Sequence, residues 1–146
     1  MKIFGLVFFF IFSSFPLMLF AQQSHQFVCG DARVDLDDWG IYESSRSLIT
    51  VTNQGKDTKL WLRSVDYFGA ECQKDAKDRD VIFVQAYCSG SGCTSDSYGI
   101  IEPSSLRIRL VPTDGSGGTS NKERAEEILG REIIKPENVF RVGEYE

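Results

Sequence analysis

Apolar and polar residues alternate with a period of two along several short segments of this chain. The pattern is clearest in residues 106–110, where Leu, Ile and Leu alternate with two arginines, and around Leu60 and Leu62. Successive side chains of a β-strand point to opposite faces, so such a segment buries one face and leaves the other in water. The chain is therefore expected to form mainly antiparallel β-sheet with one face packed on a core.

Turn residues join these segments into two predicted hairpins. Residues 47–65 contain an Asn-Gln-Gly-Lys turn, and residues 98–112 contain a Pro-Ser-Ser turn. Two further strands are predicted in residues 26–37 and 81–88, the second from a continuous apolar run that suits the centre of a sheet. The mixed-charge segment 69–80 is expected to be a solvated loop or a short exposed helix.

A short helix is predicted near the C-terminus. Ser120 followed by Glu123 has the capping-box pattern, and Gly130 is placed to end the helix. Such a short helix is not stable alone, so its apolar face must pack on the sheet. The order of elements predicts an α+β fold, a mainly antiparallel sheet of about five to six strands with one C-terminal helix packed on it.

The N-terminus resembles a secretory signal peptide. Residues 1–21 contain Lys2, a long apolar run and the small residue Ala21, which are the three parts of such a leader. A Ser-Ser-Phe-Pro stretch interrupts the apolar run and disfavours a retained anchor, which needs about 20 apolar residues. We therefore expect residues 22–146 to form a single exported globular domain, periplasmic or extracellular, with no further membrane span.

The charge of the chain bears on its partners. The full sequence has a formal net charge of −5, and cleavage of the leader removes one lysine and no acidic residue. An acidic surface argues against nucleic acid and anionic lipid, because both reward a basic patch. It favours a basic protein partner instead.

Four cysteines in an exported chain predict two disulfides, with three possible connectivities. Ser-Gly-Ser-Gly between Cys88 and Cys93 gives the backbone the freedom that a tight ring needs, which favours this pair and leaves Cys29 with Cys72. A Cys-x-x-Cys redox motif and paired zinc knuckles both need spacings that the chain lacks. The cysteines are expected to be structural, and neither a metal nor a cofactor is expected.

Catalytic groups are scarce. His25 is the only histidine and lies near the expected mature N-terminus, so a Ser-His-Asp or Cys-His centre is not expected. Residues 31–43 hold five carboxylates, but Trp39 and Arg46 fall where a calcium loop of EF-hand type needs ligands. The alternatives left open are a looser calcium site, a small-ligand site or a minor hydrolase using these carboxylates. No catalytic residue is assigned, and the balance favours a protein that is not an enzyme.

Aromatic side chains suggest a binding surface. Trp61 alternates with Leu60 and Leu62 and is expected to face away from the core, flanked by Lys59 and Arg63. An outward tryptophan is a typical interface anchor, although the helix or the C-terminal segment could instead cover it.

The candidate partner-binding residues combine these aromatics with nearby aspartates: Trp61, Trp39, Tyr42, Asp35, Asp37 and Asp38. The favoured function is that of a small exported, non-enzymatic protein that binds another protein. Examples are an inhibitor, or an immunity-type neutraliser, of a cell-envelope enzyme or a toxin. The oligomeric state is left open.

Overall fold

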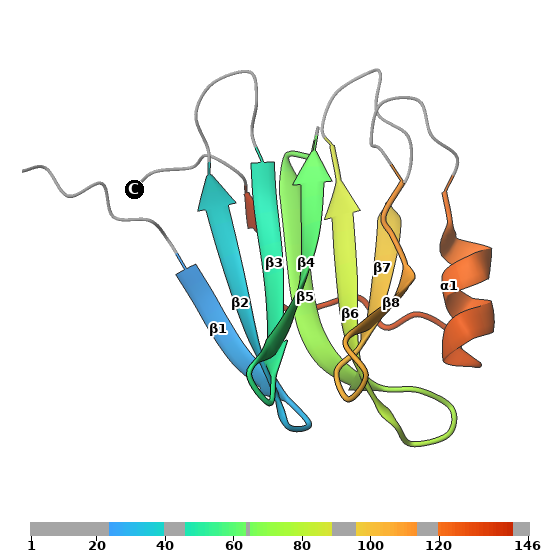
Figure 1. Cartoon of the computed structure of the whole chain (residues 1–146). Helices are drawn as coiled ribbons and strands as arrows, with labels where there is room; N and C mark the ends of the chain where they lie inside the picture. The colour runs from blue at the N-terminus through green and yellow to red at the C-terminus, as the bar shows by residue number, and fades with distance from the viewer. Residues whose placement is uncertain (1–23, 40–45, 64, 89–95, 114–119, 142–146) are drawn as a thin grey trace, which may run out of the picture.

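A computed structural model describes residues 24–39, 46–63, 65–88, 96–113 and 120–141. These ranges form two antiparallel sheets and one helix (Figure 1). The expected signal peptide, residues 1–21, and Cys93 lie outside them. Within the described ranges, no helix has the length and apolar character needed to cross a membrane.

The first sheet contains four strands that are neighbours both in the chain and in space. They are β1 (Ser24–Cys29), β2 (Ala32–Trp39), β3 (Arg46–Asn53) and β4 (Lys56–Arg63). The β1–β2 turn places Gly30 at a φ of 58°, the sign that the first central residue of a type II′ turn requires. The β3–β4 turn has Gln54 at 50° and Gly55 at 75°, as a type I′ turn requires. The predicted hairpin with an Asn-Gln-Gly-Lys turn is thus confirmed.

The second sheet contains five strands in the spatial order β8-β7-β6-β5-β9. They are β5 (Tyr67–Lys74), β6 (Asp80–Tyr87), β7 (Ser97–Glu102), β8 (Arg107–Leu110) and β9 (Phe140–Arg141). The predicted second hairpin is confirmed as β7 and β8. A bulge pairs Ile101 with Ile108 but Ile100 with Leu110, so one strand serves two cores: Ile108 packs between the sheets and Leu110 packs toward the helix.

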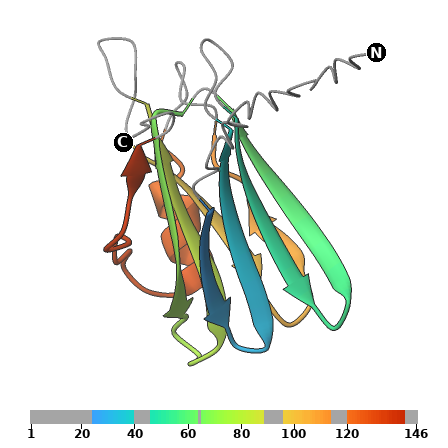
Figure 2. The ribbon, with the colours of Figure 1, turned by 90° about the vertical axis from the view of Figure 1, so that its left-hand side faces the viewer.

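The two sheets pack face to face around the main core. Buried side chains from β1 to β4 meet those from β5, β6 and β7, with Phe68, Ile49 and Leu36 among the largest. A disulfide between Cys29 and Cys72 joins β1 to β5, and the two Cα atoms are 5.1 Å apart. The view along the sheets shows this layering, with β4 at the right-hand edge (Figure 2).

A second core lies on the other face of the second sheet. The helix α1 (Lys122–Leu129) packs Ala125 and Leu129 there against Phe83, Tyr98 and neighbouring side chains. The predicted packing of a short C-terminal helix on a sheet is therefore present. This helix covers the second sheet and, among the described residues, no helix covers the outer face of the first sheet.

The segment after the helix, residues 131–139, crosses the outer face of β5. The Gln73 side chain donates to the carbonyl of Ile134 at 2.7 Å, and Glu71 accepts from the backbone N–H of Glu137 at 3.1 Å. Gly69, on the same face, has no side chain to obstruct the segment. Alternate residues of β5 therefore hold the C-terminal segment against the sheet.

The predicted single sheet of about five to six strands was wrong, because the described residues form nine strands in two sheets. Residues 26–37 are not one strand but the β1–β2 hairpin, in which alternation continues across a two-residue turn and hides it. Residues 69–80, expected to form a loop or helix, contain most of β5. The polar residues that disguised this strand are those that hold the C-terminal segment.

The start of the helix also differs from the prediction. Asn121, and not Ser120, is the residue before the first helical turn, and no side-chain hydrogen bond caps the helix. The capping box of Ser120 and Glu123 was therefore wrong. Gly130 ends the helix as predicted, with a φ of 68° and its N–H bonded to the carbonyl of Glu126 at 2.8 Å.

Candidate binding surface

The outer face of the first sheet is turned away from the second sheet. Strand alternation places every second residue of β1 to β4 on it, in rows that cross the sheet. One row runs from Asp37 through Leu48 to Trp61. The exposed side chains of this outer face are Gln26, Val28, Arg33, Asp57, Lys59 and Trp61.

Among the side chains that the structure describes on this outer face, Trp61 is the largest exposed apolar one, with half of its surface, 50%, open to solvent. The sequence left open whether the helix or the C-terminal segment covers it. Both pack on the second sheet. The helix does so through Leu129, and the segment through the carbonyl of Ile134, which accepts from Gln73 of β5. Neither the helix nor the described part of the C-terminal segment therefore covers Trp61.

Asp35 and Asp37 lie on the same outer face as Trp61. Arg33 donates from Nε and from a terminal nitrogen to the Asp35 carboxylate, at 3.1 and 2.9 Å. The hydrogen bond, and then the charge of Asp35, raise the pKa of Arg33. A carboxylate engaged by a guanidinium makes a poor calcium ligand, so this contact disfavours a calcium site at Asp35.

The remaining candidate partner-binding residues lie at the limit of the described structure. Asp38 and Trp39 end β2, where their backbones pair with Ser47 and Arg46 of β3. Their side chains, and all of Tyr42, lie outside the described part of the chain. Binding roles for these three residues stay predictions.

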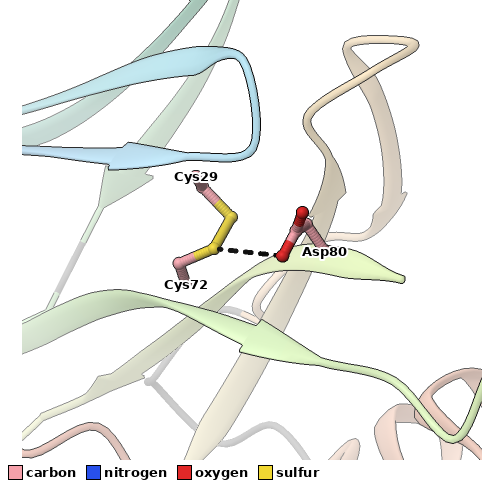
Figure 3. Close-up of side chains that lie close together, drawn as sticks. All are labelled: Cys29, Cys72 and Asp80. Atoms are coloured by element: carbon pink, nitrogen blue, oxygen red, sulfur yellow. Dashed lines mark hydrogen bonds between the residues drawn. A yellow bond between two sulfur atoms is a disulfide. The ribbon is translucent and has the colours of Figure 1, made fainter. Parts of the chain in front are cut away.

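The disulfide between Cys29 and Cys72 lies beside a carboxylate (Figure 3). An oxygen of Asp80 is 3.9 Å from Cys72 Sγ, and the potential ligand atoms of all three residues fall within 4.8 Å of one another. The two sulfurs are bonded to each other and offer no thiolate, while Asp80 forms an ion pair with Lys74 at 2.9 Å. The arrangement is therefore a covalent link between the sheets.

The same bond limits the connectivity of the other cysteines. Because Cys29 and Cys72 are joined, Cys88 pairs with neither of them. This excludes two of the three possible connectivities. The predicted bond between Cys88 and Cys93 involves a residue outside the described ranges and stays a prediction.

A charged cleft of about 280 Å³, which the sequence did not indicate, lies where the end of α1, the β5–β6 turn and β8 meet. Its charged lining residues are Asp75, Lys77, Arg79, Arg109, Arg124 and Glu127. A smaller pocket of about 90 Å³ adjoins it and shares Asp75, Arg79 and Arg109. The small-ligand alternative places its site near residues 31–43, and the described part of that stretch, residues 31–39, lines neither hollow.

Internal ion pairs engage most of the charged residues that line this cleft. The buried Asp75 carboxylate accepts from the backbone N–H groups of Lys77 and Arg79 at 2.8 and 3.0 Å, and from Arg79 Nε at 2.7 Å. Burial raises the pKa of Asp75, but the hydrogen bonds, chiefly from Arg79, outweigh it and leave the pKa below its usual value. Arg109 is likewise bound by Glu102. These contacts identify the cleft as a structural junction.

The exposed tryptophan, the ion pair at Asp35 and the lack of a covering element among the described helix and strands together make the outer face of the first sheet the candidate binding surface. Neither of the two hollows described above is lined by a residue of this outer face, and a surface without a pocket suits a macromolecule better than a small molecule. Compared with known proteins, the chain matches no family model, no curated protein and no solved structure.

Proposed function

We propose that residues 22–146 form an exported, non-enzymatic protein that binds another protein with the outer face of its first sheet. The observation that carries this proposal is Trp61, half exposed on a sheet face that neither α1 nor the C-terminal segment covers. Tryptophan is among the residue types most enriched at binding hot spots, and Val28, which is 69% exposed, adds a second apolar side chain to the same outer face.

The composition of the outer face fits a protein interface. Trp61 is a large, rigid anchor next to Leu48, and it is bordered by the ion pairs Arg33–Asp35 and Asp57–Lys59. An apolar centre with charges of both signs around it is the usual anatomy of a protein-binding site. The ion pairs fix orientation more than affinity, because they are exposed to solvent.

The net charge favours a basic partner. The sequence carries −5 overall, so a basic protein would be attracted over a distance of about one Debye length. Inhibition or neutralisation of a basic toxin or cell-envelope enzyme is the role that this combination supports best. A rigid domain held by a disulfide between its sheets suits that role, because it loses little conformational entropy on binding.

The experiment is a quantitative pull-down from envelope and secreted fractions, using oxidised residues 22–146 as bait. Trp61→Ala is compared with Val111→Ala, a matched control at a side chain that is 55% exposed on another part of the molecule. A specific partner should be recovered by the wild type and the control and lost with Trp61→Ala. With the purified partner, Trp61→Ala should weaken binding by about 30-fold, the loss of about 2 kcal/mol expected for an anchor residue. Equal affinity for Trp61→Ala would contradict the proposal.

A further inference from the structure

Strand β4 is the open edge of the first sheet. Among the described strands it pairs only with β3. The opposite edge, β1, is joined covalently to β5 by the disulfide. β4 has eight residues, and along the side that faces away from β3 such an edge strand exposes a row of backbone donors and acceptors.

The β3–β4 turn determines which backbone groups of β4 face outward. Asn53 and Lys56 close a two-residue turn and so exchange both of their backbone hydrogen bonds. The pattern then alternates, and Thr58, Leu60 and Leu62 also direct their N–H and C=O groups to β3. Asp57, Lys59 and Trp61 therefore direct theirs away from the sheet. The side chains of these three residues lie on the outer face.

We propose that β4 pairs antiparallel with β4 of a second copy of this chain, with Leu60 of each copy at the two-fold axis. This register joins the two first sheets into one continuous sheet. It places Lys59 directly opposite Trp61 of the second copy, and Trp61 opposite that copy's Lys59. The outward backbone groups of both residues then become hydrogen-bonded pairs.

Electrostatic complementarity between two copies of β4 favours a second copy of this chain as the strand that pairs with this edge. The Leu60-centred register sets each Lys59 ammonium against the indole of Trp61 on the other copy, which is a favourable cation–π pair. A register centred on Lys59 would instead oppose two lysines and is disfavoured. A lysine in the middle of an edge strand discourages pairing with strands that offer its ammonium no partner, whereas Trp61 of a second copy offers one.

The interface between the two β4 strands is small, so the dimer is expected to be weak. One pair of edge strands buries less than the roughly 1,200 Å² of a stable interface, so the dimer forms reversibly at high protein concentration. Its formation leaves both outer faces open and brings the two Trp61 side chains onto one surface. The inference does not depend on the proposed binding function.

The test combines sedimentation velocity over a range of concentrations with amide hydrogen exchange measured by NMR. In the wild type, the sedimentation coefficient should rise with concentration, and the amides of Lys59 and Trp61 should become protected as it rises. Lys59→Pro removes an outward N–H that β3 does not use, so the domain should stay folded and lose the dimer. Ile134→Asp, at a side chain that is 62% exposed on the C-terminal segment, is the matched control and should dimerise normally.

A second variant covers the possibility that Lys59→Pro does not fold. Lys59→Glu keeps the backbone intact but removes both cation–π pairs, and should weaken dimerisation by about tenfold. A wild type that stays monomeric up to about 1 mM, or a dimer that persists in both variants, would overturn the inference. A wild type that dimerises but recovers no partner in the pull-down, or one that recovers a partner and stays monomeric, separates this inference from the proposed function.

Discussion

The side chain of Asn121 hydrogen-bonds to both backbone groups of Tyr98. Its Oδ1 accepts from the Tyr98 N–H at 2.8 Å, and its Nδ2 donates to the Tyr98 carbonyl at 2.7 Å. An asparagine amide can replace a strand neighbour in this way because it carries one acceptor and one donor side by side. The contact fixes the start of α1 against β7, and with it the position of the second core.

Replacing Asn121 with Ala should therefore lower the free energy of unfolding by about 2 kcal/mol, because two backbone groups of Tyr98 lose their partners. Urea denaturation measures this. Ser120→Ala is the matched control, since its hydroxyl makes only longer contacts of 3.2 and 3.3 Å at the surface, and it should cost less than about 0.5 kcal/mol. Equal losses for the two variants would contradict the role of Asn121.

The raised pKa of Tyr98 should make the protein less stable at high pH. Burial, then the charge of Asp96 and a hydrogen bond to it, raise the pKa of Tyr98 from 10.0 to about 12. Between these values the unfolded chain releases the phenol proton and the folded chain keeps it, so the free energy of unfolding falls as pH rises. The expected loss is of the order of 3 kcal/mol. Tyr98→Phe should remove this part of the pH dependence, and an unchanged slope in urea denaturation from pH 9 to 12 would refute it.

The disulfide between Cys29 and Cys72 predicts a large effect of reduction. It closes a loop with a sequence separation of 43, for which chain entropy gives about 4 kcal/mol. The double variant Cys29→Ala, Cys72→Ala should lose this amount in urea denaturation. Adding reductant should lower the stability of the wild type further than that of the variant, and identical responses of the two would count against the prediction.

A side chain at position 69 should clash with the C-terminal segment that crosses β5. A Cβ atom at this position would lie 2.4 Å from the carbonyl oxygen of Asn138. Gly69→Ala should cost about 2 kcal/mol, because the segment must move off the face of β5. In a chain that ends at Glu137 the same substitution should cost almost nothing. A similar cost in both backgrounds would show that the clash lies elsewhere.

Two of the hairpins could be predicted because their signals are local. The turn at Gln54 and Gly55 and the alternation in Leu60 and Leu62 lie within one short stretch of chain. The β1–β2 hairpin was missed because alternation runs unbroken through the turn at Gly30. Strand β5 was missed because Gln73 has its partner, Ile134, 61 residues away.

The candidate site was predictable in the same partial way. Alternation alone indicated that Trp61 faces away from the core, and that Asp35 and Asp37 share one face of their strand. The contact between Arg33 and Asp35, two residues apart, was present in the sequence as a same-face pair but was not singled out. The charged cleft was not foreseen, since Arg79, Arg109 and Arg124 come from three separate elements.

By itself, the sequence determined the strands and turns whose signals are local, such as the β3–β4 hairpin with its turn at Gln54 and Gly55 and the apolar side of β4, since these depend on neighbours in the chain. The tertiary structure decided that the strands divide into two sheets, and that α1 covers the second sheet instead of Trp61. Those outcomes depend on contacts between distant residues, such as Asn121 with Tyr98 and Leu129 with Phe83. A short helix could pack on the apolar or half-apolar face of either sheet. The sum of the contacts between distant residues determines on which sheet it packs.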